Sequence, residues 1–369
     1  MEYQTYSAKK ILNIHKHPDG GWFWVKYSAY PYLGCYFGCE YCYERDEKYL
    51  PYKGHLEQFD QLIKVKENAP ELLEKELKKV TPDLIAVGDW QPAEKKYRLS
   101  RKMLEICYQQ GFPVFILEKS PLILEDLNLL KKIDKKADVV TGFSIITTKD
   151  DKTRKIFEPK ASAIKTRFLV MKKIAQAGIL TGTSFMPILP FIYDDEANLE
   201  AVVKETKQSG GAYVLAGGLT LWGGVKPYFF GVLKKNFPQL LPKYQKLFAS
   251  DSEFGRYWFR ISNQVRKLCQ KYNLSYYIPR PVKYFPKKLI FNKEMAAKFY
   301  QRARDLKESG GNSYKEWAYR KAAWAIDDLD QSLIDIYQKS WLVGIQKING
   351  IGNRLAHEIE KEIKASNFN

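Results

Sequence analysis

The sequence lacks the features of membrane and secreted proteins. It has no apolar run near the roughly 18 to 20 residues that a membrane span needs, and its first residues lack the basic-then-apolar pattern of a signal peptide. Its five cysteines in 369 residues include three within one eight-residue stretch, which does not suit a disulfide-stapled scaffold. We therefore expect a globular, cytoplasmic protein with reduced thiols and no membrane contact.

The three clustered cysteines are Cys35, Cys39 and Cys42, in the stretch GCYFGCEYC. Histidine is scarce, with four in the whole chain, and Cys107 and Cys269 lie far away in the sequence. A structural zinc site needs a fourth Cys or His. Three thiolates can instead hold three irons of a 4Fe-4S cluster and leave the fourth iron open. We interpret the triplet as cluster ligands, with zinc binding or coincidental packing as the alternative.

Short β-rich runs alternate with helix-like stretches of period 3.6 over most of the chain. The runs are FWVKYSAY (23–30), LIAVG (84–88), VFIL (114–117), ADVVTGFSII (137–146), ILTGTSFMPIL (179–189) and AYVLAGG (212–218). Such alternation predicts a parallel sheet, either doubly wound or a barrel of (β/α) units. In both folds ligands bind at the C-terminal ends of the strands. The cysteine triplet follows the first run directly, so we expect it at that end.

Positive charge is concentrated in one part of the chain. The net charge is +18, and residues 226–288 hold 14 basic and two acidic residues, with aromatics between them. Basic side chains neutralise phosphates and aromatic rings stack on bases, so this block suits DNA or another nucleic acid. A solvated basic surface over core aromatics is the alternative. We predict three parts: a core at 1–225, this basic extension and linker at 226–290, and a helical DNA-binding domain at 291–369.

Near the C-terminus, Gly350-Ile351-Gly352 and Asn353 lie between two helical segments. Glycines in such a hairpin let backbone N–H groups approach a phosphate, assisted by the N-terminus of the following helix. The stretch therefore predicts a helix-hairpin-helix that holds a duplex backbone. An ordinary helical corner with a glycine cap is the alternative.

Cys-x3-Cys-x2-Cys with an aromatic before the third cysteine resembles the radical S-adenosylmethionine superfamily. Further blocks are similar to the spore photoproduct lyase and "DNA repair photolyase" branch: PYLGCYFGCEYCYERD, GDWQPAEKKYRLSRKMLE, FPVFILEKSPLILEDLNLL, FEPKASAIKTR and FMPILPFIYDDE. The resemblance implies a partial (β/α)6 barrel. It also implies a 4Fe-4S cluster whose open iron binds S-adenosylmethionine, and reductive cleavage of that cofactor to a 5'-deoxyadenosyl radical. An electron donor such as flavodoxin or ferredoxin would supply the electron.

The resemblance also implies roles for single residues. Lys119 and Ser144 match positions that contact the methionine carboxylate of the cofactor, although a solvated lysine and a plain strand serine are the alternative. The other implied positions are Tyr41 near the adenine, Tyr43 near the cluster and the radical path as a catalytic residue, and Gly88 and Asp89 at the cofactor. Spore photoproduct lyase carries a hydrogen-donating cysteine at the end of its second strand, and LIAVGDWQP has none. We therefore expect a related repair or modification reaction.

Residues 292–363 resemble the small N-terminal domain of X family DNA polymerases, which binds gapped DNA. Tyr319, Arg320 and Lys321 match its second-helix signature, and Arg354 matches a basic residue of its 5'-phosphate pocket. Where that domain has a Schiff-base lysine, this chain has Glu358. An imine needs an amine, so the resemblance implies DNA binding by this domain without lyase chemistry of its own.

The favoured hypothesis is a radical S-adenosylmethionine enzyme, lyase-like, that repairs or modifies DNA. One alternative is a DNA-binding iron–sulfur adaptor or sensor without radical turnover. Another is a radical enzyme that acts on a substrate other than nucleic acid.

Overall fold

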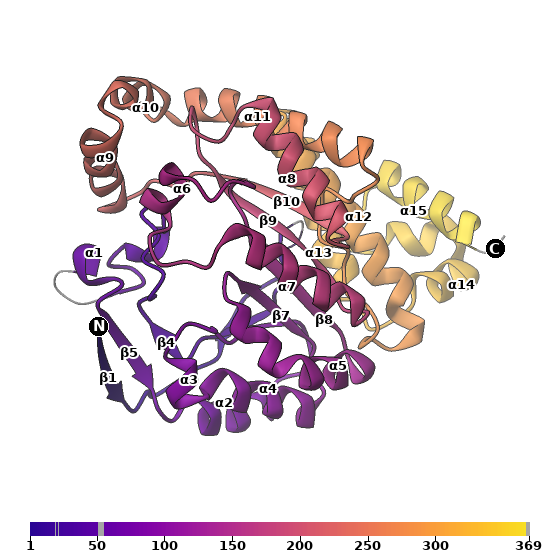
Figure 1. Ribbon diagram of the computed structural model, residues 1–369. Coiled ribbons are helices and arrows are strands. Elements are labelled where there is room, and N and C mark those ends of the chain that lie inside the picture. The colour runs from indigo at the N-terminus through magenta and orange to yellow at the C-terminus, as the bar shows by residue number, and fades with distance from the viewer. Residues whose placement is uncertain (19, 21, 51–54, 367–369) are drawn as a thin grey trace. The chain divides into compact units, whose positions relative to one another are not determined.

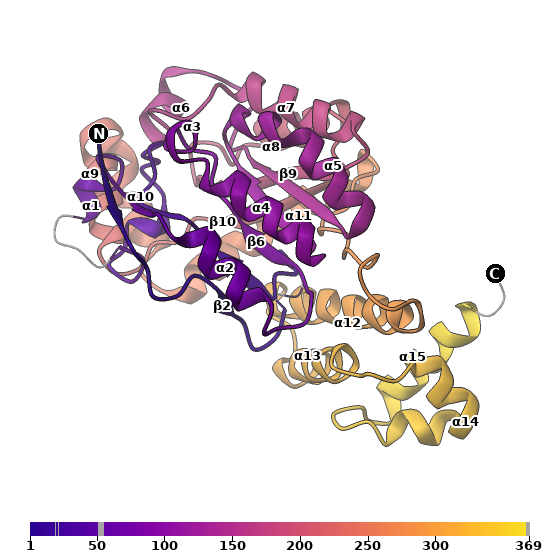
Figure 2. The same cartoon turned by 90° about the horizontal axis from the view of Figure 1, so that it is seen from below.

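The computed structural model describes residues 1–18, 20, 22–50 and 55–366 (Figures 1 and 2). Contacts divide the chain into two compact units. Unit 1 comprises Met1–Ile14 and Val25–Ile278, and unit 2 comprises His15–Trp24 and Pro279–Asn369. The basic extension up to residue 278 thus folds with unit 1, and the division falls within its Pro- and Lys-rich end.

The main sheet of unit 1 contains all six predicted strands. They are β3 (Tyr27–Ala29), β6 (Ile85–Val87), β7 (Val114–Glu118), β8 (Val139–Ser144), β9 (Leu180–Ile188) and β10 (Tyr213–Gly218). The strand order is β10-β9-β8-β7-β6-β3-β2, and every pair is parallel except β2 (Asn13–Ile14) with β3. A doubly wound sheet reverses its order at a switch point, whereas this order follows the chain. The predicted α/β fold with a partial (β/α)6 barrel is confirmed.

A second, smaller sheet has the order β1-β5-β4. It is formed by β1 (Glu2–Tyr6), β5 (Leu62–Lys66) and the two-residue β4 (Tyr32–Leu33). We expected the cysteine triplet directly after the first barrel strand, but β4 intervenes. Because β4 pairs antiparallel with β5, the start of the cysteine loop is attached to this small sheet.

Helices cover one face of the main sheet (Figure 1). They are α2 (Ala69–Leu77), α4 (Leu99–Gln110), α5 (Leu127–Lys136), α7 (Ile164–Gln176) and α8 (Glu196–Gln208), with the short α1 (His55–Gln58), α3 (Glu94–Tyr97) and α6 (Lys152–Phe157) in the connections. Alternate strand residues such as Ile116, Phe143 and Phe185 pack against them in the core. The core therefore lies between the sheet and this helical layer.

The positions between those core residues face the other way, because successive side chains of a strand alternate. By the strand register, Leu117 shares this inner face with Gly142 and Gly182. Leu117 is 42% exposed although β7 lies in the middle of the sheet. The inner face of the partial barrel is therefore open at this point.

The basic extension forms α9 (Val225–Asn236), α10 (Leu241–Leu247) and α11 (Asp251–Lys271). One stripe of α11 with Tyr257, Ile261 and Val265 is buried in the core of unit 1, while Arg256 and Arg260 are exposed. Part of the aromatic content of this stretch thus packs in the core, while Arg256 and Arg260 lie on the surface.

Unit 2 consists mainly of α12 (Ile290–Glu308), α13 (Ser313–Asp327), α14 (Leu333–Gln346) and α15 (Asn353–Ser366). Short 3-10 turns lie at Tyr43–Arg45, Pro121–Asp126, Pro238–Leu240 and Lys287–Leu289. The predicted break at Gly-Gly-Asn-Ser separates α12 from α13, because Asn312 caps α13 by accepting a hydrogen bond from Lys315 N. No helix among the described residues has the length and apolar character to cross a membrane.

A buried ion cluster ties unit 2 together. The carboxylate of Asp327 accepts hydrogen bonds from Arg280 Nη2 at 2.6 Å and from Lys293 Nζ at 3.0 Å. The Arg280 guanidinium also lies 5.2 Å from the ring centroid of Trp24. Residues far apart in sequence thus converge on one buried carboxylate.

We predict that Asp327→Ala lowers the free energy of unfolding by about 3–5 kcal/mol, because it leaves two buried cations without their shared carboxylate. Urea unfolding followed by circular dichroism would measure this loss. Asp330→Ala, at an exposed position, serves as the control and should change stability by less than about 0.5 kcal/mol. Equal stability of the two variants would contradict the prediction.

Candidate functional site

The three predicted metal ligands lie on one loop after β4. Cys35, Cys39 and Cys42 are all free thiols, with Cys39 buried and the other two partly exposed. Gly38 N donates to Cys35 O and Cys42 N donates to Cys39 O, both at 3.2 Å. The loop thus makes two consecutive turns, each starting at a cysteine.

A buried arginine, Arg45, holds this loop in place. Its Nε donates to Cys39 O at 3.0 Å and its Nη2 donates to Gly38 O at 2.8 Å. Its guanidinium also lies 4.8 Å from the ring centroids of Phe59 and Tyr228. The Cys39 and Gly38 carbonyls lie outside regular secondary structure, and Arg45 supplies hydrogen-bond donors to them. Sequence reasoning missed Arg45, and only its place three residues after the triplet could have indicated it.

Gln91 holds the loop from the other side. Its Oε1 accepts from Tyr36 N at 3.0 Å, and its Nε2 donates to Gly34 O at 3.1 Å and to Asp89 Oδ2 at 2.8 Å. The side chain is fully buried and links the end of β6 to both neighbours of Cys35. Gln91 was also missed, because its partners in the cysteine loop, Gly34 and Tyr36, are more than 50 residues away in sequence.

Gly34 is required by the backbone itself. Its φ is +82°, and a Cβ there would lie 2.7 Å from Leu62 O and 3.0 Å from Phe59 O. Only glycine combines this conformation with so close an approach to the backbone. The glycine before Cys35 is therefore part of the geometry of the cysteine loop.

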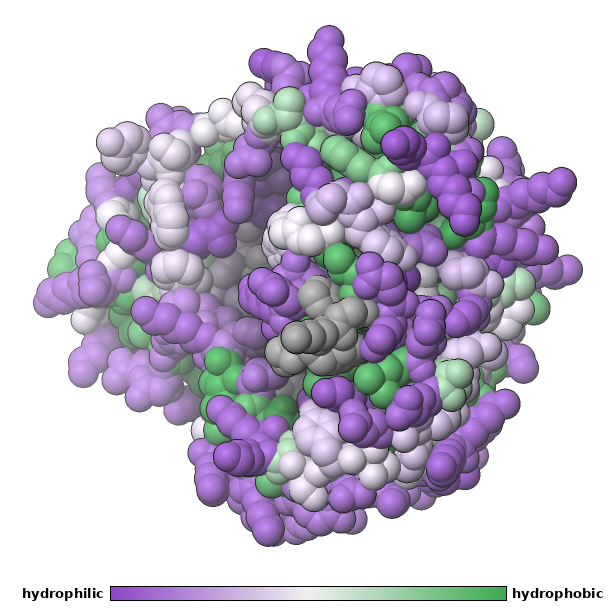
Figure 3. Space-filling view, turned by 90° about the vertical axis from the view of Figure 1, so that its left-hand side faces the viewer, coloured by the Kyte–Doolittle hydropathy of each residue, from purple (hydrophilic) through white to green (hydrophobic). Residues whose placement is uncertain are grey.

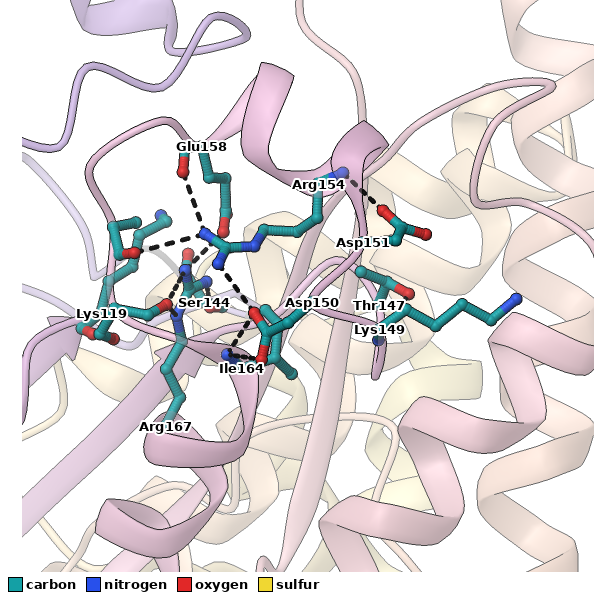
Figure 4. Close-up of polar contacts among 12 residues, drawn as sticks. Lys119, Ser144, Thr147, Lys149, Asp150, Asp151, Arg154, Glu158, Ile164 and Arg167 are labelled. Carbon is teal, nitrogen blue, oxygen red and sulfur yellow. Dashed lines mark hydrogen bonds and ion pairs between the residues drawn. The ribbon is translucent and has the colours of Figure 1, made fainter.

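Arg167 and Glu158, both labelled in Figure 4, form a fully buried ion pair. Arg167 Nη2 donates to Glu158 Oε2 at 2.5 Å, and the Tyr41 hydroxyl donates to Glu158 Oε1. Burial alone would raise the pKa of Glu158, but the charges of Arg167 and Lys119 outweigh it and hold that pKa below its usual range. Since the Tyr41 hydroxyl is thus occupied, its ring and backbone are the parts left to contact a cofactor.

Lys119 follows β7 and reaches the same place. Its Nζ lies 5.9 Å from the ring centroid of Tyr41. Burial would lower the pKa of Lys119, but the neighbouring Cys39 and Glu158 raise it overall. Its backbone carbonyl accepts a hydrogen bond from the Ser162 hydroxyl, which fixes the end of the strand. Lys119 therefore remains a cation beside the cysteine loop.

Ser144 ends β8 and lies in register with Ser184 of β9 on the inner face. Its carbonyl accepts from Arg167 Nη1 at 2.8 Å (Figure 4). The Ser184 hydroxyl is buried and has no hydrogen-bond partner among the described residues. A buried hydroxyl without a partner is costly, so Ser184 is a further candidate to contact a ligand. The pattern Gly182-Thr-Ser184 on a buried strand was the available sequence signal.

The two predicted positions at the end of β6 differ in their surroundings. Gly88 has a φ of +84°, and a Cβ there would lie 2.7 Å from the Trp90 ring. Asp89 is partly exposed and is held by Gln91. Burial, followed by repulsion from Glu118, raises the pKa of Asp89 well above its usual value. Asp89 also influences Cys35 electrostatically, so it lies at the edge of the cysteine loop.

The thiols fit a metal cluster in number and environment. Burial is the main cause that raises the pKa of each of the three, and repulsion from a neighbouring thiol adds to it at Cys35 and Cys42. Binding to iron would remove the protons and relieve this cost. No three His, Cys, Asp or Glu side chains in the described part of the chain are placed to hold a metal ion. A 4Fe-4S cluster differs from that arrangement, because each thiolate binds its own iron.

In unit 2 the predicted DNA-binding residues come together around the hairpin between α14 and α15. The Arg354 guanidinium lies 5.2 Å from the ring centroid of Tyr319. A Cβ at Gly350 would lie 3.7 Å from the carbonyl oxygen of Lys321. Arg320, between Tyr319 and Lys321 in the sequence, pairs with Glu316 one turn earlier on α13 at 2.6 Å. The hairpin therefore packs against the middle of α13.

The hairpin is anchored by Ile351, which is buried, while Gly350, Gly352, Asn353 and Arg354 are exposed. Neither hairpin glycine donates its N–H to a backbone carbonyl within the described residues. Gly350 has a φ of +86°, which favours glycine. Exposed N–H groups and a neighbouring cation are thus available to an anion.

Comparisons with known proteins give relatives without an assigned activity. An uncharacterised protein of Methanocaldococcus jannaschii is 27% identical over 72% of this chain and 94% of its own. An uncharacterised protein of Mycobacterium tuberculosis is 25% identical over 74% of this chain and 82% of its own. No family model matches the chain.

Among solved structures, the cobalamin-dependent S-adenosylmethionine radical enzyme OxsB is similar at a TM-score of 0.33 and 11% identity. The match covers 92% of this chain, which spans about half of that enzyme (53%).

We predict that Glu158→Gln lowers the free energy of unfolding by about 3–5 kcal/mol at pH 7, because Arg167 keeps a buried charge without its partner. The pKa of Glu158 is lowered on folding, so its contribution is present above the unfolded value near 4.5. That contribution is lost as the pH falls through the folded pKa. The gap between wild type and variant should therefore narrow in urea titrations at pH 7, 5 and 3. A gap that widens on acidification would contradict this account.

Proposed function

We propose that the chain is a radical S-adenosylmethionine enzyme with a 4Fe-4S cluster on Cys35, Cys39 and Cys42. The observation that carries the proposal is that three free thiols lie beside the partly buried Lys119 after β7, while the inner face of the sheet holds the unpartnered Ser184 hydroxyl. Ligands bind at the C-terminal ends of the strands in parallel α/β folds.

Each residue would have a distinct task. Bound there, a reduced cluster supplies the electron that cleaves S-adenosylmethionine to a 5'-deoxyadenosyl radical. Lys119 offers a cation to the methionine carboxylate, and the hydroxyls of Ser144 and Ser184 offer hydrogen bonds from the inner face. Arg45 and Gln91 keep the loop in one conformation. A small donor protein such as flavodoxin or ferredoxin would deliver the electron.

The proposed substrate is DNA, repaired or modified by a lyase-like reaction. Support comes from the helix-hairpin-helix geometry of unit 2, which exposes glycine N–H groups beside Arg354 and Lys321. The 14 basic against two acidic residues at 226–288 support it as well. Helix N-termini and cations are the groups that hold phosphates without reading bases.

We predict that Cys35→Ala abolishes both cluster binding and cofactor cleavage. After anaerobic reconstitution, iron and sulfide content should fall to near background, and dithionite should yield no 5'-deoxyadenosine. Cys269→Ala is the matched control, because Cys269 is buried in α11 and belongs to the hydrophobic core. Wild-type protein that carries a full cluster but never forms 5'-deoxyadenosine would overturn the enzyme proposal and favour a DNA-binding sensor.

A separate prediction concerns unit 2. Arg354→Ala should weaken binding to gapped duplex DNA by a similar factor for all sequences. It should also reduce the slope of log affinity against log salt by about 1, as expected for one lost phosphate contact. Lys364→Ala removes a cation near the opposite end of the same helix and should leave the slope unchanged. Equal slopes for wild type and Arg354→Ala in fluorescence anisotropy would contradict the role of the hairpin.

A further inference from the structure

An aromatic cluster lies directly beside the cysteine loop in unit 1. Tyr43 follows Cys42, and its ring centroid lies 5.4 Å from that of Tyr49 and 5.9 Å from that of Trp222. Both contacts are edge-to-face, and Tyr43 and Trp222 are each 43% exposed. Two large rings thus keep much of their surface open next to a proposed cluster ligand. We call Tyr43, Tyr49 and Trp222 the aromatic rim.

The backbone places Trp222 in this rim. Trp222 lies on the connection after β10, and Val225 N donates to Trp222 O at 3.1 Å where α9 begins. Gly223 has a φ of +48°, and a Cβ there would collide with the carboxylate of the buried Asp46. The connection after the last barrel strand therefore packs closely on the segment that follows the cysteines. The packing of this connection therefore fixes Trp222 at an exposed position in unit 1.

A cation accompanies the rings. Lys48 Nζ lies 5.4 Å from the centroid of Tyr49 and 5.6 Å from that of Trp222. This arrangement keeps a positive charge at the rim through cation–π attraction. The chain that continues from Trp222 is the basic stretch, with Lys234 and Lys235 exposed on α9. Figure 3 views the side where α1 and α9 lie, and hydrophilic residues predominate there.

Unit 1 exposes further large apolar side chains besides those of the rim. Tyr30, which follows β3, is 42% exposed, as is Leu117 on the inner face.

We infer that the aromatic rim stacks one base of a nucleic-acid strand, with Trp222 as the main stacking residue and Lys48 beside the backbone of that strand. This inference rests on the proposed function and deepens it, because it names the base as the group presented to the site. Base–aromatic stacks accept any base, and the neighbouring cations match the charge of a phosphate backbone. The rim thus suits an unpaired or flipped-out base, as duplex stacking would block the same ring face.

The test compares two short single strands on anaerobically reconstituted full-length protein. One is a five-residue oligothymidylate, and the other is its abasic analogue with the same phosphates. Wild type should bind the thymidylate more tightly, and Trp222→Leu should reduce this base preference by about 5- to 150-fold, the range of one lost stack. Trp222→Phe should retain most of it. Leu169→Ala is the control, because Leu169 is 52% exposed on α7 and lies outside both the rim and the basic stretch at 226–288.

The outcomes separate the inference from the proposed function. An unchanged base preference in Trp222→Leu, with normal oligonucleotide binding, overturns the rim alone. The inference is also overturned if Trp222→Leu weakens binding of the thymidylate and abasic strands by the same factor, because the rim would then hold only phosphates. A wild-type protein that binds neither strand overturns the nucleic-acid substrate itself and the rim's occupant with it. Unaltered circular dichroism and 5'-deoxyadenosine formation without substrate would confirm that Trp222→Leu keeps its fold and its cluster.

Discussion

The alternation of side chains along the parallel strands of unit 1 is the constraint on which the candidate site depends. Residues such as Ile116 and Phe143 must face the helical layer to form the core, so their neighbours Leu117 and Ser144 must face inward. A one-residue slip in register would exchange the two sets. Gly142 and Gly182 make room for the buried Tyr213 side chain, because a Cβ at Gly182 would lie 2.7 Å from its ring. Which side chains face inward is thus a consequence of how the core is packed.

The cysteine loop is held by long polar side chains, because it has almost no regular secondary structure of its own. Arg45, Gln91 and the Glu158–Arg167 pair satisfy or orient its backbone and its tyrosine. Burying such groups costs desolvation energy, and the cost is offset only while every partner remains. The arrangement therefore favours one loop conformation over many. Burial makes each of the three thiols costly to ionise, and as thiolates they would repel one another. Binding to a metal cluster would relieve both costs.

The sequence predicted the elements that depend on local pattern. The six apolar runs became the six parallel strands, and the Gly-Gly-Asn-Ser break separates two helices, because periodicity and capping act over a few residues. The cysteine triplet was found by spacing alone. Gln91 and Trp222 were missed because their neighbours Gly34 and Tyr43 lie far away in the sequence. Arg45 was missed although it bonds carbonyls of the cysteine loop itself, and Ser184 was missed because nothing local marks a hydroxyl without a partner. The two-residue β4 was also missed, since its pairing with β5 leaves almost no local signal.

In unit 2, Glu358 stands where the domain of X family DNA polymerases that this stretch resembles has a lysine. This one difference changes the chemistry that the surroundings allow. Glu358 accepts hydrogen bonds from the Tyr319 hydroxyl at 3.0 and 3.2 Å, and it pairs with Arg302. An amine at this point would offer a nucleophile to a sugar aldehyde. The Glu358 carboxylate is instead hydrogen-bonded to the Tyr319 hydroxyl and paired with the Arg302 guanidinium. Arg354 stacks on the same tyrosine and stays exposed. The hairpin therefore leaves Arg354 and its backbone N–H groups accessible to an anion, while position 358 offers no amine for covalent chemistry.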